Sequence, residues 1–93
     1  MATTISKWDA AEHLDSDEAI AAYLSEVMES GDQRHIVQAL NTVARARGMT
    51  EIAKDAGIAR QALYKSFSDK GNPTLSTLLG VFKSLGLSLA VKG

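Results

Sequence analysis

Four glycines divide this chain into short segments, and each segment repeats apolar residues at the spacing of an α-helix. Gly31, Gly48, Gly57 and Gly86 stand at the ends of these segments, a position where glycine commonly ends a helix. Within a segment the apolar residues recur three or four positions apart, which places them on one helical face. A chain of 93 residues has room for one hydrophobic core and not for two. We therefore predict a single all-α domain that spans residues 1–93.

The first two of the five principal helices that we expect lie in the N-terminal half of the chain. Asp15 and Glu18 have the spacing of a capping box ahead of the first helix, and Asp32 is placed to cap the second. The apolar stripe of the first helix is Ala19, Ile20, Tyr23, Leu24, Val27 and Met28. The stripe of the second is Ile36, Val37, Leu40, Val43 and Ala44.

The other three expected helices follow Gly48. Two short helices cover about 50–56 and 59–67. Asn72 followed by Pro73 predicts the start of the last helix, because asparagine is a good cap and proline suits the first helical position. The apolar face of this helix is Leu75, Leu78, Leu79, Phe82 and Leu85.

Charge is divided unevenly along the chain, although the net charge is only −1. Residues 1–33 hold eight acids against one base, Lys7, whereas residues 34–93 hold nine bases against three acids. This division predicts two surfaces of opposite sign or, alternatively, acids and bases that pair within the molecule. We interpret 1–33 as an acidic N-terminal helical extension and 34–93 as the core of the domain.

The composition argues against catalysis, metal binding and membrane insertion. The chain has no cysteine, so it lacks thiol nucleophiles and thiolate ligands. His13 and His35 have neither the spacing of paired metal ligands nor a serine in a nucleophile arrangement. No apolar run is long enough to cross a bilayer, and the N-terminus lacks the order of a signal peptide. We expect a cytoplasmic protein that is not an enzyme and needs no cofactor.

The stretch EIAKDAGIARQALYKSF, residues 51–67, has the pattern of two helices that cross at a tight turn. Ala53 is small enough to let a second helix pass closely, and Gly57 can take the positive φ of a sharp reversal. These features are typical of a helix-turn-helix; the alternative is that the stretch only builds a small helical core. The residues expected to point inward are Ile52, Ala53, Ala56, Ile58, Leu63 and Phe67.

The outward face of the second of these helices carries side chains that suit DNA. Arginine can donate two hydrogen bonds to guanine in the major groove, and glutamine can pair with adenine. Lysine and tyrosine more often contact phosphates. The alternative is an ordinary solvated helix face, with Tyr64 at the edge of the core. The predicted DNA-binding residues are Arg60, Gln61, Tyr64, Lys65, Lys70, Asn72 and Thr50.

The C-terminal tail changes to a period of two residues. Leu87, Leu89 and Val91 alternate with smaller or polar residues, which predicts one short β-strand with an apolar face. A lone strand has an unpaired edge, and pairing with the same strand of a second chain would make a symmetric dimer. The alternative is an extended tail that is either frayed or packed on its own domain.

The segment MTEIAKDAGIARQALYKSFSDKGNPTLSTLLGVFKSLGLSLAV resembles the DNA-binding domain of the Cro/repressor-type helix-turn-helix family. Together with WDAAEHL, AIAAYL and ARARGMTEIAKDAG, it makes almost the whole chain similar to the addiction-module antidote proteins, the Hig-type antitoxins. The resemblance implies a dimeric antitoxin of a type II toxin–antitoxin module. Such a protein neutralises a small, RelE-like ribonuclease toxin and represses its own operon by binding operator DNA.

Two positions depart from the pattern of that family. Ala59 stands just before the predicted recognition helix, where family members usually carry serine or threonine. A hydroxyl there would cap the helix, and losing such a cap typically costs about 1 kcal/mol, so we expect weaker or retuned DNA binding. Ser66 occupies an anchor position that is usually apolar, and we expect Phe67 to supply that packing.

The acidic N-terminal third is the candidate surface for the toxin that the resemblance implies. A ribonuclease presents basic surface to RNA, so an acidic antidote surface would complement it. The candidate partner-binding residues are Trp8, Asp9, Glu12, Asp15, Asp17 and Glu18. Tyr23 is a further candidate, although core packing also explains Tyr23 and Trp8. For the acids the alternative is a solvated face that caps the start of a helix.

Two other functions are compatible with the same residues. The nearer is a phage-type transcriptional repressor that has no toxin partner. The more distant is a protein-interaction module whose helix-turn-helix has lost DNA binding. Binding to DNA with a steep salt dependence would distinguish the first two functions from the third.

Overall fold

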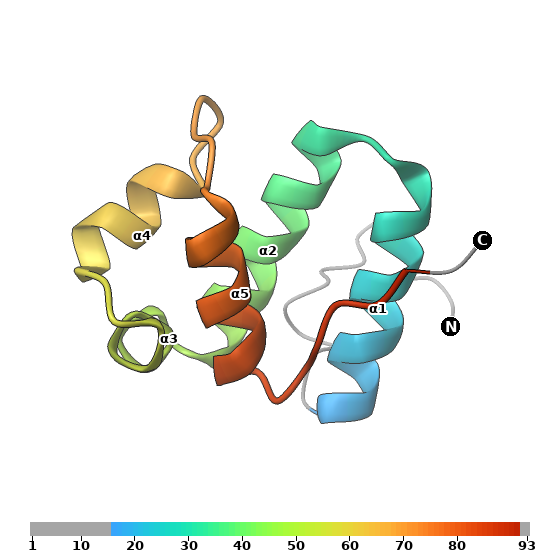
Figure 1. Ribbon diagram of the computed structural model, residues 1–93, viewed down its shortest axis with the longest axis horizontal. Coiled ribbons are helices and arrows are strands. Elements are labelled where there is room, and N and C mark those ends of the chain that lie inside the picture. The colour runs from blue at the N-terminus through green and yellow to red at the C-terminus, as the bar shows by residue number, and fades with distance from the viewer. Residues whose placement is uncertain (1–15, 92–93) are drawn as a thin grey trace, which may run out of the picture.

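The computed structural model describes residues 16–91, and these residues form five α-helices and no strand. Figure 1 shows α4 at one end of the molecule and α1 at the other, with α5 crossing between them. The expected all-α domain is therefore confirmed. In chain order the helices are α1 (Asp17–Ser30), α2 (Gln33–Arg47), α3 (Met49–Ala56), α4 (Arg60–Ser66) and α5 (Leu75–Ser84).

Short polar side chains set the starts of α1 and α2. The Oγ atom of Ser16 accepts a hydrogen bond from the N–H of Ala19 at 3.1 Å, so Ser16 is the N-cap of α1 where Asp15 was predicted. Asp15 itself lies outside the described residues. Asp32 caps α2 as predicted, because its Oδ1 atom accepts from the N–H groups of Arg34 and His35 at 3.0 and 3.3 Å.

The start of α5 was predicted two residues too early. Thr74 is its N-cap, with an Oγ1 atom that accepts a hydrogen bond from the N–H of Thr77 at 3.1 Å. Asn72 and Pro73 belong to the preceding loop. The residue before a proline is disfavoured in helical conformation, so the chain stays extended there until the threonine hydroxyl can satisfy the first free N–H groups.

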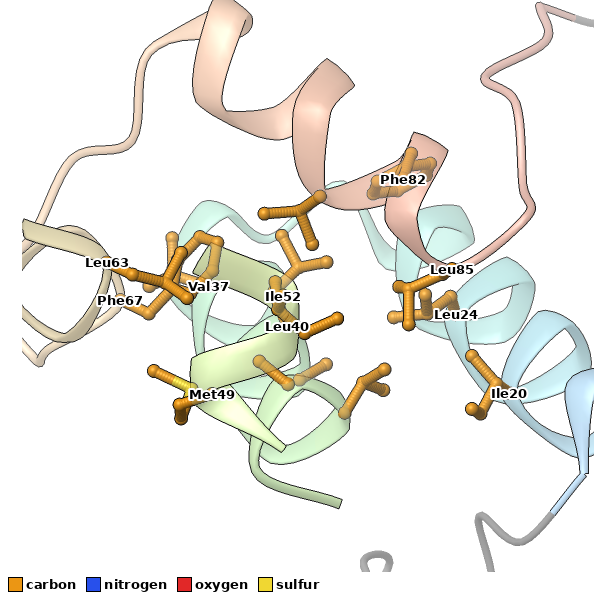
Figure 2. Close-up of a cluster of buried hydrophobic side chains, with 14 of the residues drawn as sticks. Ile20, Leu24, Val37, Leu40, Met49, Ile52, Leu63, Phe67, Phe82 and Leu85 are labelled. Carbon is orange, nitrogen blue, oxygen red and sulfur yellow. The ribbon is translucent and has the colours of Figure 1, made fainter. Parts of the chain in front are cut away.

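The core joins all five helices, and α3 packs against α2, α4 and α5. Figure 2 shows side chains from each helix converging on one interior. Within residues 16–91, no polar or charged side chain is buried. The buried residues are Ile20, Leu24, Val27, Val37, Ala39, Leu40, Val43, Ala44, Met49, Ile52, Ala53, Leu63, Phe67, Val81, Phe82 and Leu85.

The buried face of α5 differs from the predicted one. Leu75 and Leu79 are 65% and 48% exposed, whereas Val81, which the prediction omitted, is fully buried. The cause is a close crossing of α5 over α3. A Cβ atom added to Gly80 would lie 3.0 Å from the Cβ of Ala56, so α5 turns its Gly80 side toward α3. That rotation moves Leu75 and Leu79 toward solvent.

The tail after α5 is extended but forms no strand in the single chain. The N–H of Leu87 donates to the carbonyl of Phe82 at 2.8 Å, and the Leu87 side chain packs against the core. Leu89 and Val91 are exposed. The tail runs alongside α1 (Figure 1), and together they border a shallow hollow. Leu87 thus packs on the domain while residues 88–91 are exposed, and no ladder forms within the described residues because a strand ladder needs a second strand.

Candidate nucleic-acid interface

The turn between α3 and α4 is fixed by the backbone. Gly57 has φ 73° and ψ 29°, a left-handed conformation that glycine adopts without steric cost. Its N–H donates to the carbonyl of Lys54 at 3.2 Å, and the N–H of Ile58 donates to the carbonyl of Ala53 at 3.0 Å. This pair of bonds is the Schellman motif that closes a helix. The predicted role of Gly57 is confirmed.

Two buried side chains seat α4 on the domain. Leu63 is fully buried and Phe67 is 2% exposed. Ser66, between them in register, is only partly buried, so Phe67 supplies the packing that was expected of it. Ala59 has the extended conformation of an N-cap but makes no side-chain hydrogen bond to the helix. The first turn of α4 therefore lacks a side-chain cap.

The outward face of α4 presents its polar residues to solvent. Arg60, Gln61, Tyr64 and Lys65 are all exposed, and Tyr64 stands outside the core cluster at 42% exposure. The Nη2 atom of Arg60 donates to the Oη of Tyr64 at 3.2 Å. The Arg60 guanidinium carbon lies over the Tyr64 ring, 5.4 Å from its centroid. Tyr64 is thus a surface residue paired with Arg60, not an aromatic ring at the edge of the core.

The loop after α4 folds back on that helix. The N–H of Gly71 donates to the carbonyl of Ser68 at 2.8 Å. A Cβ atom at Gly71 would lie 2.2 Å from the carbonyl oxygen of Ser66, so no side chain fits there. Lys70 and Asn72, on either side of Gly71 in the sequence, are exposed. Asn72 lines a shallow hollow with Gly31 and Gln33 at the junction of α1 and α2.

The sequence analysis did not predict that the first turn of α2 lies beside the loop after α4. The first turn of α2, at Gln33 and Arg34, lines a shallow hollow together with Ser68 and Asp69 of the loop after α4. Arg34 is exposed there. More than thirty residues separate the two segments, so no local pattern could have brought them together. Thr50, the remaining predicted DNA-binding residue, is exposed in the first turn of α3.

Comparison with known proteins places the chain in a family. A family model described as "probable addiction module antidote protein" matches residues 4–93. The chain belongs to this family. An uncharacterized protein of Haemophilus influenzae (strain Rd) is 45% identical over 92 residues, which cover 99% of the antidote and 95% of the relative. No solved structure matches the antidote.

Membership of this family implies a role and a partner for the chain. An antidote of an addiction module acts as an antitoxin, and its family is not a class of enzymes. The role implies a toxin as partner. Within residues 16–91, no group of three or more potential ligands could hold a metal ion. In the same residues, no helix is both long enough and apolar enough to pass through a membrane.

Two of the predicted toxin-contacting residues lie in the first turn of α1. Asp17 and Glu18 are both exposed, and Asp17 forms an ion pair with Arg47, the last residue of α2. This pair ties α1 to α2, although an exposed pair of this kind contributes little stability. It also shows that one acid of the N-terminal extension pairs within the molecule. The other candidates, which lie outside the described residues, are Trp8, Asp9, Glu12 and Asp15.

Tyr23 belongs to the core and not to the exposed acidic face. Its side chain is partly buried and packs against the core cluster. Burial raises the pKa of the Tyr23 hydroxyl, and a hydrogen bond with Thr42 of α2 lowers that pKa in part. Core packing, the alternative considered for Tyr23, therefore accounts for this residue.

Proposed function

We propose that this antidote is a Cro/repressor-like, Hig-type antitoxin that binds operator DNA through α4, represses its own operon and neutralises a RelE-like ribonuclease. The observation that carries DNA binding is the seating of α4. Leu63 and Phe67 anchor the helix, while the polar residues on its other side are exposed next to a loop that is itself held in place. A protein with this role acts in the cytoplasm, where its operator and its toxin are found.

Each exposed residue has a distinct task in this proposal. Arg60 and Gln61 lie in the first turn of α4, the part of a recognition helix that contacts base edges. Arginine suits guanine and glutamine suits adenine. Contacts with phosphates fix the position of the protein on the duplex. Phosphate contacts are assigned to Thr50, Tyr64, Lys65, Lys70 and Asn72.

The test of this assignment compares substitutions on α4. Arg60→Ala and Gln61→Ala should each weaken binding to promoter DNA by about 1–3 kcal/mol, with the helical circular dichroism spectrum unchanged. Lys65→Ala should weaken binding to promoter DNA and to a scrambled duplex alike, because a phosphate contact carries no sequence information. Unchanged gel-shift affinity in both Arg60→Ala and Gln61→Ala would remove α4 from the role of recognition helix.

The tail is the proposed dimer interface. Its backbone N–H and C=O groups at residues 88–91 make no backbone hydrogen bond with residues 16–91, and a second tail would offer partners for them. Leu89 and Val91 are exposed and would form the apolar side of that pairing, while Leu87 is already packed against its own core. A two-fold dimer would present two copies of α4 to a palindromic operator.

The toxin is proposed to contact the acidic N-terminal extension. Asp9, Glu12 and Glu18 should be reversed together to lysine, because this set leaves the Asp17–Arg47 ion pair in place. We expect weaker binding to the co-expressed toxin in pull-down and calorimetry, since like charges would then face a basic ribonuclease. Glu26→Lys, an exposed change further along α1, is the matched control. Equal toxin affinity in the triple variant and the wild type would show that the toxin binds elsewhere.

A further inference from the structure

A side-chain hydrogen bond joins Arg60 and Tyr64 on the exposed face of α4. They are four residues apart, so they stand one above the other on the helix surface. The contact has two components. The Nη2 atom of Arg60 lies 3.2 Å from the Tyr64 hydroxyl oxygen, and the guanidinium lies over the ring at a distance at which a cation is attracted to it.

This contact leaves Arg60 able to bind DNA. A guanidinium has five N–H donors, and the bond to Tyr64 uses one of them. A bidentate contact with the O6 and N7 atoms of guanine needs two. The Tyr64 oxygen acts as acceptor toward Arg60, so its own O–H hydrogen stays available to donate to a phosphate oxygen. Base contact and phosphate contact can therefore exist together.

The position of the pair on α4 allows Tyr64 to hold the Arg60 side chain in place. Arg60 is the first residue of a seven-residue helix whose N-cap, Ala59, supplies no side-chain hydrogen bond. Tyr64 follows directly after Leu63, which is fully buried. The pair thus connects an uncapped first turn to the turn that is anchored in the core. An arginine side chain has many rotamers, and holding it in place before binding reduces the entropy lost on binding.

We infer that Tyr64 is a positioning residue that orients Arg60 and thereby sets the preference of the antidote for guanine at one operator position. This inference rests on the proposed DNA-binding function. The inference goes beyond that function because it gives Tyr64 an effect on sequence preference. A phosphate contact alone would change the affinity for all sequences equally.

The test uses a duplex selected from a random-sequence pool with the full-length wild-type protein. The guanine read by Arg60 is the one whose replacement by adenine weakens the wild type but not Arg60→Ala. Discrimination is the ratio of the affinities for the guanine and adenine duplexes, and a bidentate contact makes this ratio about tenfold or more. It is measured for the wild type, Arg60→Ala, Tyr64→Ala, Tyr64→Phe and the double variant Arg60→Ala/Tyr64→Ala.

We expect Tyr64→Ala to lose most of the discrimination and the double variant to match Arg60→Ala, because the two residues act as one unit. Tyr64→Phe keeps the ring beneath the guanidinium and should retain part of the discrimination. Lys65→Ala is the control and should weaken both duplexes by the same factor. Circular dichroism on each variant reports any loss of α4.

One result would overturn the inference while leaving DNA binding intact. It is a Tyr64→Ala variant that binds both duplexes more weakly but keeps the wild-type ratio. If the wild type selects no duplex from the pool, the proposed function itself fails, which is a separate outcome.

Discussion

Ala59 leaves the start of α4 without a side-chain cap. Its backbone is extended, with φ −69° and ψ 143°, the geometry in which a serine or threonine hydroxyl can accept from the first turn of a helix. We predict that Ala59→Ser raises the free energy of unfolding by about 1 kcal/mol, measured by urea denaturation. Ala62→Ser, an exposed change inside the same helix, is the control, because serine is less favourable than alanine there. If Ala59→Ser stabilises the protein no more than the control does, the capping argument is wrong.

Single residues were predictable where one backbone geometry demanded them. Gly57 could be assigned to the turn because a left-handed residue was needed between two short helices, and Leu63 because the second helix needed an anchor. The contact between Arg60 and Tyr64 was not predicted, although their spacing of four residues was a usable signal. Whether such a pair forms depends on side-chain orientation, which periodicity does not specify.

At the scale of helices, the crossing of α5 over α3 determines which residues α5 buries. Gly80 leaves room for the backbone of Ala56, since an added Cβ would lie within 3.3 Å of three Ala56 atoms. We predict that Gly80→Val lowers the free energy of unfolding by about 1–3 kcal/mol, because overpacked side chains force the helices apart. Ser76→Val, on the exposed side of α5, should change it by less than about 0.5 kcal/mol. Equal unfolding midpoints for the two variants would mean that the crossing is not tightly packed.

The existence of the helices was predictable, but the direction in which α5 turns was not. Repeated apolar residues located all five segments, and a glycine follows four of them. The spacing of Leu75 and Leu79 also fitted a buried stripe, yet both are exposed. A stripe of leucines shows only that one face of a helix can be buried. The close approach of Gly80 to Ala56 determines which face of α5 is buried.

At the scale of the whole molecule, acidic and basic residues only partly separate. Asp17 pairs with Arg47 across α1 and α2, so part of the charge division serves the fold. Arg60, Gln61, Tyr64 and Lys65 are exposed on α4. This helix lies at the end of the molecule away from α1 (Figure 1). The antitoxin role follows from the family, whereas the proposed DNA binding rests on this exposed surface. The alternating pattern of the tail predicted a strand, but residues 87–91 form none within residues 16–91, because a strand ladder needs a second strand.

The most direct test of the account is the salt dependence of DNA binding by the wild-type protein. Affinity for the promoter DNA of its own gene and for a scrambled duplex should be measured between about 50 and 200 mM salt. We predict a preference for the promoter, with log affinity falling linearly against log salt by roughly 0.9 per neutralised phosphate. With Lys65 and Lys70 on phosphates, the slope should be about −2 or steeper for each protomer. Equal, weak and salt-independent binding to both duplexes would contradict the claim that α4 reads DNA.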